Sequence, residues 1–127
     1  MSTPDPSSEV ARRFFGAWRY RGSKVDGELR TDRGEGRGII IYDPSGHMAV
    51  QIMPSRAEAA TAPASQFLAY FGTYSIDERA GTVTHHREGD LRPDGEIDAV
   101  REYEFVGDRL ILRPVGKAQE IMWERIK

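Results

Sequence analysis

The chain has 127 residues, of which 39% are hydrophobic and 30% charged, and its formal net charge is −2 at neutral pH. A chain of this length buries about two thirds of its unfolded surface, which suffices for one domain but not for two. The balanced charge argues against a nucleic-acid partner, and the absence of cysteine excludes disulfides, thiolate nucleophiles and cysteine-based zinc sites.

The first nine residues are polar and contain prolines. They lack the basic and apolar segments of a secretory signal, and no later apolar run approaches the ~20 residues of a membrane-spanning helix. We therefore expect a disordered tail over residues 1–9, a single domain over residues 10–127, a cytoplasmic location and no membrane partner.

The N-terminal region combines a short helix with the start of a strand. Residues 10–15 predict one or two helical turns that end at Gly16. After this glycine, apolar and polar side chains alternate, which places Trp18 and Tyr20 on one face of a strand. The glycine- and charge-rich residues 23–35 then predict a loop.

The rest of the chain consists mainly of short runs with the two-residue alternation of β-strands. Turn residues separate them, including Asp43-Pro44-Ser45-Gly46 and Gly107-Asp108. Residues 64–71 instead have apolar side chains at helical spacing and predict one short helix. After the first strand, the predicted strands span residues 28–31, 37–42, 47–53, 73–77, 82–88, 99–106, 109–113 and 119–126. About eight short strands without βαβ alternation indicate an all-β sandwich or up-and-down barrel.

Several short motifs resemble the lipocalin-like domain family of small bacterial and fungal proteins. In chain order they are Gly16-Ala17-Trp18-Arg19, residues 41–53, Ala69-Tyr70-Phe71-Gly72-Thr73-Tyr74, Thr82-Val83-Thr84-His85-His86, Gly107-Asp108-Arg109-Leu110 and Trp123-Glu124-Arg125. The resemblance implies a small closed antiparallel barrel with an internal pocket. Together with the predicted elements, it indicates a single barrel of about eight strands that one short helix caps or flanks. Some members are encoded beside biosynthetic enzymes, which implies a place in secondary metabolism. The resemblance says less about chemistry, because one barrel supports unrelated sites.

The two terminal motifs suit a structural role. Pairing of the first and last strands would close the barrel, and the Arg125 guanidinium could then stack on the Trp18 indole. We therefore expect these two residues to join the ends of the sheet rather than to take part in chemistry.

Alternation also assigns side chains to the interior, if the apolar face of each strand is taken as inward. Residues 47–53 are ambiguous because both of their faces are largely apolar, so Gln51 and Met53 line the interior in only one of two arrangements. The candidate ligand-binding residues are Tyr20, Gln51, Met53, Tyr74, His85, Arg101, Tyr103 and Trp123.

This lining is typical of a small-molecule site, which is mostly apolar with a few placed polar groups. A buried arginine must be paired, so Arg101 predicts either an internal carboxylate or an anionic group on the ligand. Alternatively, Arg101 lies at the barrel mouth and extends into water. An inward His85 is either a hydrogen-bonded structural residue or a general acid or base.

Three functions follow from these residues. The first is binding of a small, largely hydrophobic metabolite. The second is a cofactor-independent cyclase or isomerase acting on a polyketide- or terpenoid-like intermediate, in which His85 moves a proton and Arg101 or Tyr103 stabilises an enolate-like oxygen. The third is a barrel filled by its own side chains that serves in assembly, with a homodimer as one option.

Other chemistry has little support in the sequence. His47, His85 and His86 lack acidic or histidine partners at the spacing of metal ligands, so we expect neither a metal nor another cofactor. Ser75 is the one serine within a predicted strand, and no serine lies in a nucleophile elbow.

Overall fold

The computed structural model describes residues 4–5, 7–29, 36–92, 95 and 97–127. Parts of the predicted tail (1–3 and 6) and the end of the predicted loop (30–35) lie outside the described residues, and so does the end of the strand predicted over 28–31. The boundary between tail and domain at residue 10 stays a prediction.

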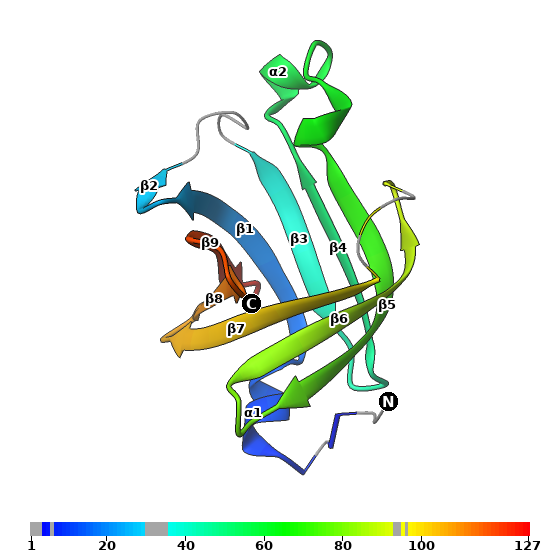
Figure 1. Ribbon diagram of the computed structural model, residues 1–127, viewed down its shortest axis with the longest axis vertical. Coiled ribbons are helices and arrows are strands. Elements are labelled where there is room, and N and C mark those ends of the chain that lie inside the picture. Colours follow the sequence, from blue (N-terminus) through cyan, green and yellow to red (C-terminus); the bar gives the residue numbers. More distant parts are fainter. Residues whose placement is uncertain (1–3, 6, 30–35, 93–94, 96) are drawn as a thin grey trace.

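In the described residues, nine strands form one antiparallel sheet that closes on itself (Figure 1). From β3 onward each strand pairs with the next in the chain, and β1 pairs with both β3 and β9. Eight strands make the barrel, and the short β2 extends the sheet beside the end of β1. The strands are β1 (Gly16–Val25), β2 (Glu28–Leu29), β3 (Arg37–Tyr42), β4 (His47–Met53), β5 (Leu68–Asp77), β6 (Thr82–Asp90), β7 (Asp98–Val106), β8 (Arg109–Pro114) and β9 (Gln119–Arg125). The predicted all-β, closed up-and-down barrel is confirmed.

Helices are short in the part of the chain that the structure describes. They are α1 (Glu9–Phe14), α2 (Arg56–Ala59) and a 3₁₀ turn, η1 (Ala64–Gln66). Ser8 caps α1, because its Oγ accepts a hydrogen bond of 3.2 Å from the backbone N–H of Ala11. The helical turns predicted before Gly16 are therefore present, and Figure 1 shows α1 and α2 at opposite ends of the barrel.

The helix predicted over residues 64–71 is wrong. Only η1 is helical there, and β5 begins at Leu68. Tyr70 is buried while Phe71 is 56% exposed, which is the alternation of a strand with one face in the core. Pairing with β4 on one side and β6 on the other outweighs the local helical spacing. As a result Tyr70 joins Tyr74 on the inner face.

The pairing of β5 with β6 is irregular at Gly72. The register of their pairing shifts between Phe71 and Gly72. A Cβ at position 72 would collide with the backbone carbonyl of His86, so glycine is required for this close approach. The irregularity gives the curvature that a small barrel needs.

The predicted joint between the ends of the sheet is confirmed. Trp18 pairs with Arg125 across β1 and β9, and the guanidinium carbon lies 4.2 Å from the centroid of the indole ring. The same two side chains hold the C-terminal end of α1. Trp18 Nε1 donates to the carbonyl of Phe14 (3.0 Å), while Arg125 donates to the carbonyls of Phe15 (2.9 Å) and Arg13. These are the carbonyls that a helix end leaves without intrahelical partners.

The side chain of Phe14 closes this end of the barrel. It is fully buried, and its ring meets those of Tyr42 and Tyr103 edge-on at 5.1 Å and that of Phe105 at 5.0 Å. Edge-to-face contacts of this kind stabilise aromatic clusters beyond the area that they bury. The core residues that line the rest of the barrel include Trp18, Tyr20, Ile40, Met48, Val50, Ile52, Tyr70, Tyr74, Val83, Leu110, Leu112 and Trp123.

We expect replacement of Arg125 by leucine to lower the free energy of unfolding by about 2 kcal/mol, since a cation–π contact and hydrogen bonds to two carbonyls are lost. Urea denaturation measures the change. Arg19 is exposed on the same strand as Trp18, and Arg19→Leu should change stability by less than about 0.5 kcal/mol. Equal losses in the two variants would contradict a special role for Arg125.

Candidate functional site

The inner face of the barrel carries most of the predicted site residues. Tyr20, Tyr74, His85 and Trp123 are each 6% exposed or less. Arg101 and Tyr103 are half-buried on β7, and their alternation with exposed neighbours places both on the inner face. The sequence pattern therefore identified the interior side of five strands.

His85 is the centre of a hydrogen-bonded chain of three side chains. The Oη of Tyr42 lies 2.6 Å from its Nε2, and the Oη of Tyr70 lies 2.6 Å from its Nδ1. The three residues come from β3, β5 and β6 and are all buried. Because β4 separates β3 from β5 in the sheet, the contact between Tyr42 and His85 reaches across the interior.

The imidazole of His85 is neutral at physiological pH. Burial lowers the pKa of His85 from its ordinary value of 6.5 to about 3, with further contributions from the positive charges of Arg101 and Arg87. Burial also raises the pKa of Tyr42 and of Tyr70, so both hydroxyls stay protonated.

The three side chains have more hydrogens to donate than the two hydrogen bonds between them use. A neutral imidazole has one N–H donor and one acceptor nitrogen. One tyrosine therefore donates to His85, whereas the other accepts from it and keeps its own O–H for a different acceptor. Tyr42 is fully buried between the rings of Phe14 and Tyr74, while Tyr70 retains 7% exposure. We therefore assign the donated proton to Tyr42 and the spare O–H to Tyr70.

Arg101 is a second donor of the interior. Its charge acts on the pKa of Tyr42, Tyr70 and His85, so the guanidinium lies within electrostatic range of the chain. It donates to the backbone carbonyl of Val100 at 3.2 Å. No acidic side chain in the described part of the protein forms an ion pair with it. Arg87, by contrast, lies 3.4 Å from a carboxylate oxygen of Asp90.

Trp123 supplies a third donor. The side chain is 1% exposed, and within the described residues its Nε1 has no hydrogen-bond partner. Its ring meets that of Tyr20 at 5.6 Å, and the Oη of Tyr20 is occupied by the Oγ of Ser23 at 2.6 Å. Buried indole N–H groups are normally satisfied. We refer to the Tyr70 hydroxyl, the Arg101 guanidinium and the Trp123 N–H as the interior donor set.

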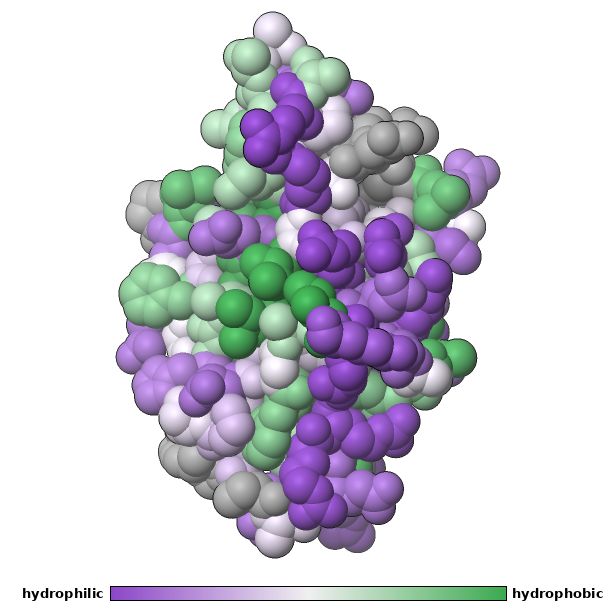
Figure 2. Space-filling model, turned by 180° about the vertical axis from the view of Figure 1, so that it is seen from behind, coloured by the Kyte–Doolittle hydropathy of each residue, from purple (hydrophilic) through white to green (hydrophobic). Residues whose placement is uncertain are grey.

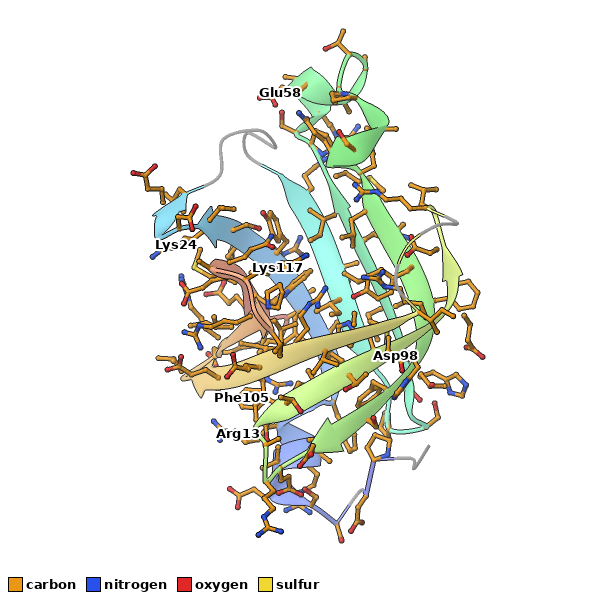
Figure 3. All side chains as sticks on the ribbon, in the orientation of Figure 1. Arg13, Lys24, Glu58, Asp98, Phe105 and Lys117 are labelled. Atoms are coloured by element: carbon orange, nitrogen blue, oxygen red, sulfur yellow. The ribbon has the colours of Figure 1, made fainter. Side chains whose placement is uncertain are left out.

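Two other predicted residues belong to the packing of the barrel. Tyr74 donates its hydroxyl to the backbone carbonyl of Asp43 at 2.8 Å. Tyr103 lies against Phe14 at the end of the barrel closed by α1. Figure 3 shows the neighbouring Phe105 at this end beside Arg13, whose guanidinium lies 4.4 Å from the Phe105 ring centroid. The structure therefore does not bring Tyr103 into the chain with His85.

Of the two arrangements left open for residues 47–53, the structure has the one in which Gln51 does not line the interior. The buried residues of β4 are Met48, Val50 and Ile52, and Gln51 is exposed on the opposite face. It lies in a surface groove of about 460 Å³ between β4, β5 and the end of β6. Met53 shares its side of the strand and is half-buried at the end of β4. Figure 2 shows that the outer surface carries an apolar patch bordered by hydrophilic side chains.

Tyr42 and Tyr70 are the site residues that sequence reasoning missed. Tyr42 ends a run in which both faces are apolar, so alternation gave it no direction. Tyr70 fell within the segment assigned to a helix. If residues 68–71 had been interpreted as a strand, every second residue before Tyr74 would have been assigned to the inner face, and Tyr70 is one of these residues.

Neither a metal-binding group nor a membrane-spanning helix is found among the described residues. No three histidine or acidic side chains there are grouped to hold a metal ion. No described helix is long and apolar enough to cross a membrane.

The buried neutral His85 should make the protein less stable as the pH falls. Since the pKa of His85 is about 3 in the folded protein and near 6.5 in the unfolded chain, its contribution is complete above pH 6.5 and decreases toward pH 3. The free energy of unfolding should fall by about 2 kcal/mol between pH 6.5 and 4.5. Urea denaturation at these pH values measures the loss, and His85→Gln should reduce it. An unchanged pH dependence in this variant would contradict the assignment.

Comparison with known proteins agrees with this architecture. A family model described as a lipocalin-like domain matches residues 16–126. The crystal structure of a DUF4847 family protein from Bacteroides vulgatus is similar, with a TM-score of 0.57 and 15% sequence identity over 93% of this chain and 98% of that chain. This likeness supports the fold alone, and a search of the curated proteins gave no match. Because the family model covers the whole barrel, the chain belongs to the lipocalin-like domain family.

Proposed function

We propose that the barrel binds a small, largely hydrophobic molecule whose polar end is an anionic or acceptor-only oxygen group, such as a carboxylate or an enolate. The observation that carries the proposal is the interior donor set. Among the described residues, the Trp123 N–H has no hydrogen-bond partner, the hydrogen bond with His85 leaves the Tyr70 O–H over, and Arg101 donates to the carbonyl of Val100 but forms no ion pair. A ligand that supplies acceptors would satisfy them, whereas a neutral hydrocarbon would not.

The position of Arg101 supports entry from the end of the barrel opposite α1. Arg101 lies across from Pro114, the last residue of β8, while the other end of β7 leads to Phe105 and the Phe14 plug. Lys24 near the end of β1 and Lys117 between β8 and β9 mark this opposite end, and Figure 3 shows both well away from Arg13 and Phe105. In this arrangement the apolar body of the ligand lies against aliphatic and aromatic side chains, and its charged end meets the arginine.

A pair of fluorescent probes tests the preference for an anion. Anilinonaphthalene sulfonate and N-phenylnaphthylamine share the same rings, but only the first carries a negative charge. We expect Arg101→Leu to weaken binding of the sulfonate about 10- to 100-fold, the value of a charge-assisted hydrogen bond, and to leave binding of the neutral amine nearly unchanged. Titration of probe fluorescence gives both dissociation constants.

The matched control is Arg19→Leu, because it removes the same charge from the outer surface. It should leave the affinity for both probes unchanged. Equal weakening of the two probes by Arg101→Leu, or equal effects of Arg101→Leu and Arg19→Leu, would overturn the proposed role of Arg101.

The Tyr42–His85–Tyr70 chain favours a second candidate function, cofactor-independent isomerisation or cyclisation of a polyketide- or terpenoid-like intermediate. The Tyr70 hydroxyl keeps its proton, and the Arg87 guanidinium lies 4.3 Å from the centroid of its ring. Such a hydroxyl can donate to an oxygen on which negative charge develops. The neutral imidazole would polarise that hydroxyl without itself gaining charge. Tyr70, rather than the Tyr103 expected from the sequence, then takes the donor role beside His85 and Arg101.

Hydrogen–deuterium exchange of β-tetralone, an apolar bicyclic ketone that enolises, tests this second function. If the Tyr42–His85–Tyr70 chain promotes enolisation, a buffer base removes the hydrogen next to the carbonyl while the Tyr70 O–H donates to the oxygen that becomes negative. The protein then accelerates exchange at this carbon, and Tyr70→Phe reduces the acceleration at least tenfold while β-tetralone still binds. An absence of acceleration by the unaltered protein would refute this second function and leave the binding proposal intact. A role in secondary metabolism and a cytoplasmic location remain predictions.

A further inference from the structure

The outer face of the barrel carries a second chain of three polar side chains, on strands β5, β6 and β7. The Oγ of Ser75 lies 2.9 Å from His86 Nε2, and His86 Nδ1 lies 2.9 Å from Asp98 Oδ1. The pairing register explains this arrangement, since His86 is opposite Asp98 on one side and opposite Thr73 on the other, two residues from Ser75. Figure 3 shows Asp98 where β7 begins, beside β5 and β6.

These three side chains have the arrangement in which a histidine, oriented by a carboxylate, activates a serine hydroxyl. The carboxylate of Asp98 accepts the Nδ1–H of His86, which fixes the tautomer and leaves Nε2 as an acceptor facing the serine. A histidine held in this way can remove the proton of the hydroxyl as it attacks a carbonyl group. The His86 side chain is 20% exposed and that of Asp98 is 59% exposed, so ester and water can reach the chain from solvent.

We propose that Ser75 is a nucleophile for acyl transfer from small activated esters, at a site separate from the barrel interior. Ser75 Oγ bonds to the acyl carbon, its proton passes to His86 Nε2, and the carbonyl electron pair moves onto the carbonyl oxygen. When that pair returns, the bond to the leaving oxygen breaks and His86 returns the proton to it. Water then attacks the acyl carbon in the same way, and the proton passes through His86 back to Ser75.

Among the described residues, β4 does not extend far enough to pair with the N–H of the residue that follows this serine. The N–H of Tyr74 bonds to the carbonyl of Gly46 at 3.0 Å, on the side of β5 that faces β4. By the alternation of a strand, the N–H of Ile76 points to the same side. The pairing of β4 with β5 begins only at His47 opposite Thr73, so the Ile76 N–H points past the end of β4. Because Ile76 directly follows Ser75 in the sequence, its N–H can stabilise the oxygen that becomes negatively charged during acyl transfer.

Another serine–histidine pair in the protein, Ser45 and His47, is a matched control for this site. The Oγ of Ser45 lies 3.0 Å from a ring nitrogen of His47, but that nitrogen is Nδ1 rather than Nε2. No carboxylate forms an ion pair with His47 within the residues that the structure covers. Ser45 thus has a neighbouring histidine without the orienting acid that distinguishes Ser75.

Labelling with a fluorophosphonate tests the proposal, with the site identified by mass spectrometry. In this reaction the Oγ–P bond forms, fluoride leaves, and His86 takes up the proton. We expect labelling at Ser75 alone, no labelling of Ser75→Ala, about 100-fold slower labelling of His86→Gln, and an unchanged rate for Ser45→Ala. Absence of labelling at Ser75, equal labelling at Ser45, or an unchanged rate in His86→Gln would overturn the proposal.

A second measurement does not depend on the rate of phosphonylation. Because the natural chain has no cysteine, Ser75→Cys and Ser45→Cys each introduce a unique thiol. A thiolate stabilised by a histidine reacts well below the usual pKa of cysteine. We expect the thiol at position 75 to react with iodoacetamide at pH 6 at least tenfold faster than the thiol at position 45, and His86→Gln to remove the difference. Equal rates for the two thiols would count against activation at position 75.

Discussion

The contact between Arg125 and Trp18 connects three parts of the molecule, the first strand, the last strand and α1. It joins the first and last strands, and it satisfies the carbonyls at the end of α1. A helix of six residues is too short to persist alone in water. Since α1 carries the Phe14 plug, opening of the seam, loss of the helix and exposure of the aromatic cluster should occur as one cooperative event. Amide hydrogens in the last turn of α1 should then exchange mainly when the barrel unfolds.

Closure at one end leaves a strongly asymmetric interior. Near α1, Trp18 Nε1 and the Tyr74 hydroxyl have internal partners, although the Trp123 N–H has none. Farther from α1, the Tyr70 hydroxyl and the Arg101 guanidinium have more hydrogens to donate than the described side chains accept. Burial of polar groups without partners is costly, so a protein folded only for stability would be expected to replace them by apolar residues. This contrast is the physical reason for placing the candidate site where the donors are in excess.

Whether the sequence predicted the direction of a side chain depended on whether its segment has one apolar face or two. Where one face was apolar, as around His85, Arg101 and Trp123, alternation gave the correct direction. Where both faces were apolar, as in β4, Gln51 could not be placed. Residues 64–71 were misassigned because the partners that make Leu68 and Tyr70 part of a strand lie on β4 and β6. Both histidine chains stayed hidden for a related reason, since their members come from three strands and meet only through the register of the sheet.

The neutral state of His85 has a consequence for any molecule that enters the barrel. An imidazole with a pKa of about 3 and two buried tyrosines with raised pKa values keep the same ionisation state across the neutral range. The interior therefore presents the same hydrogens at pH 5.5 as at pH 8. A change of affinity over this range would report the ionisation of the bound molecule itself, and its midpoint would give the acidity of the group that Arg101 meets.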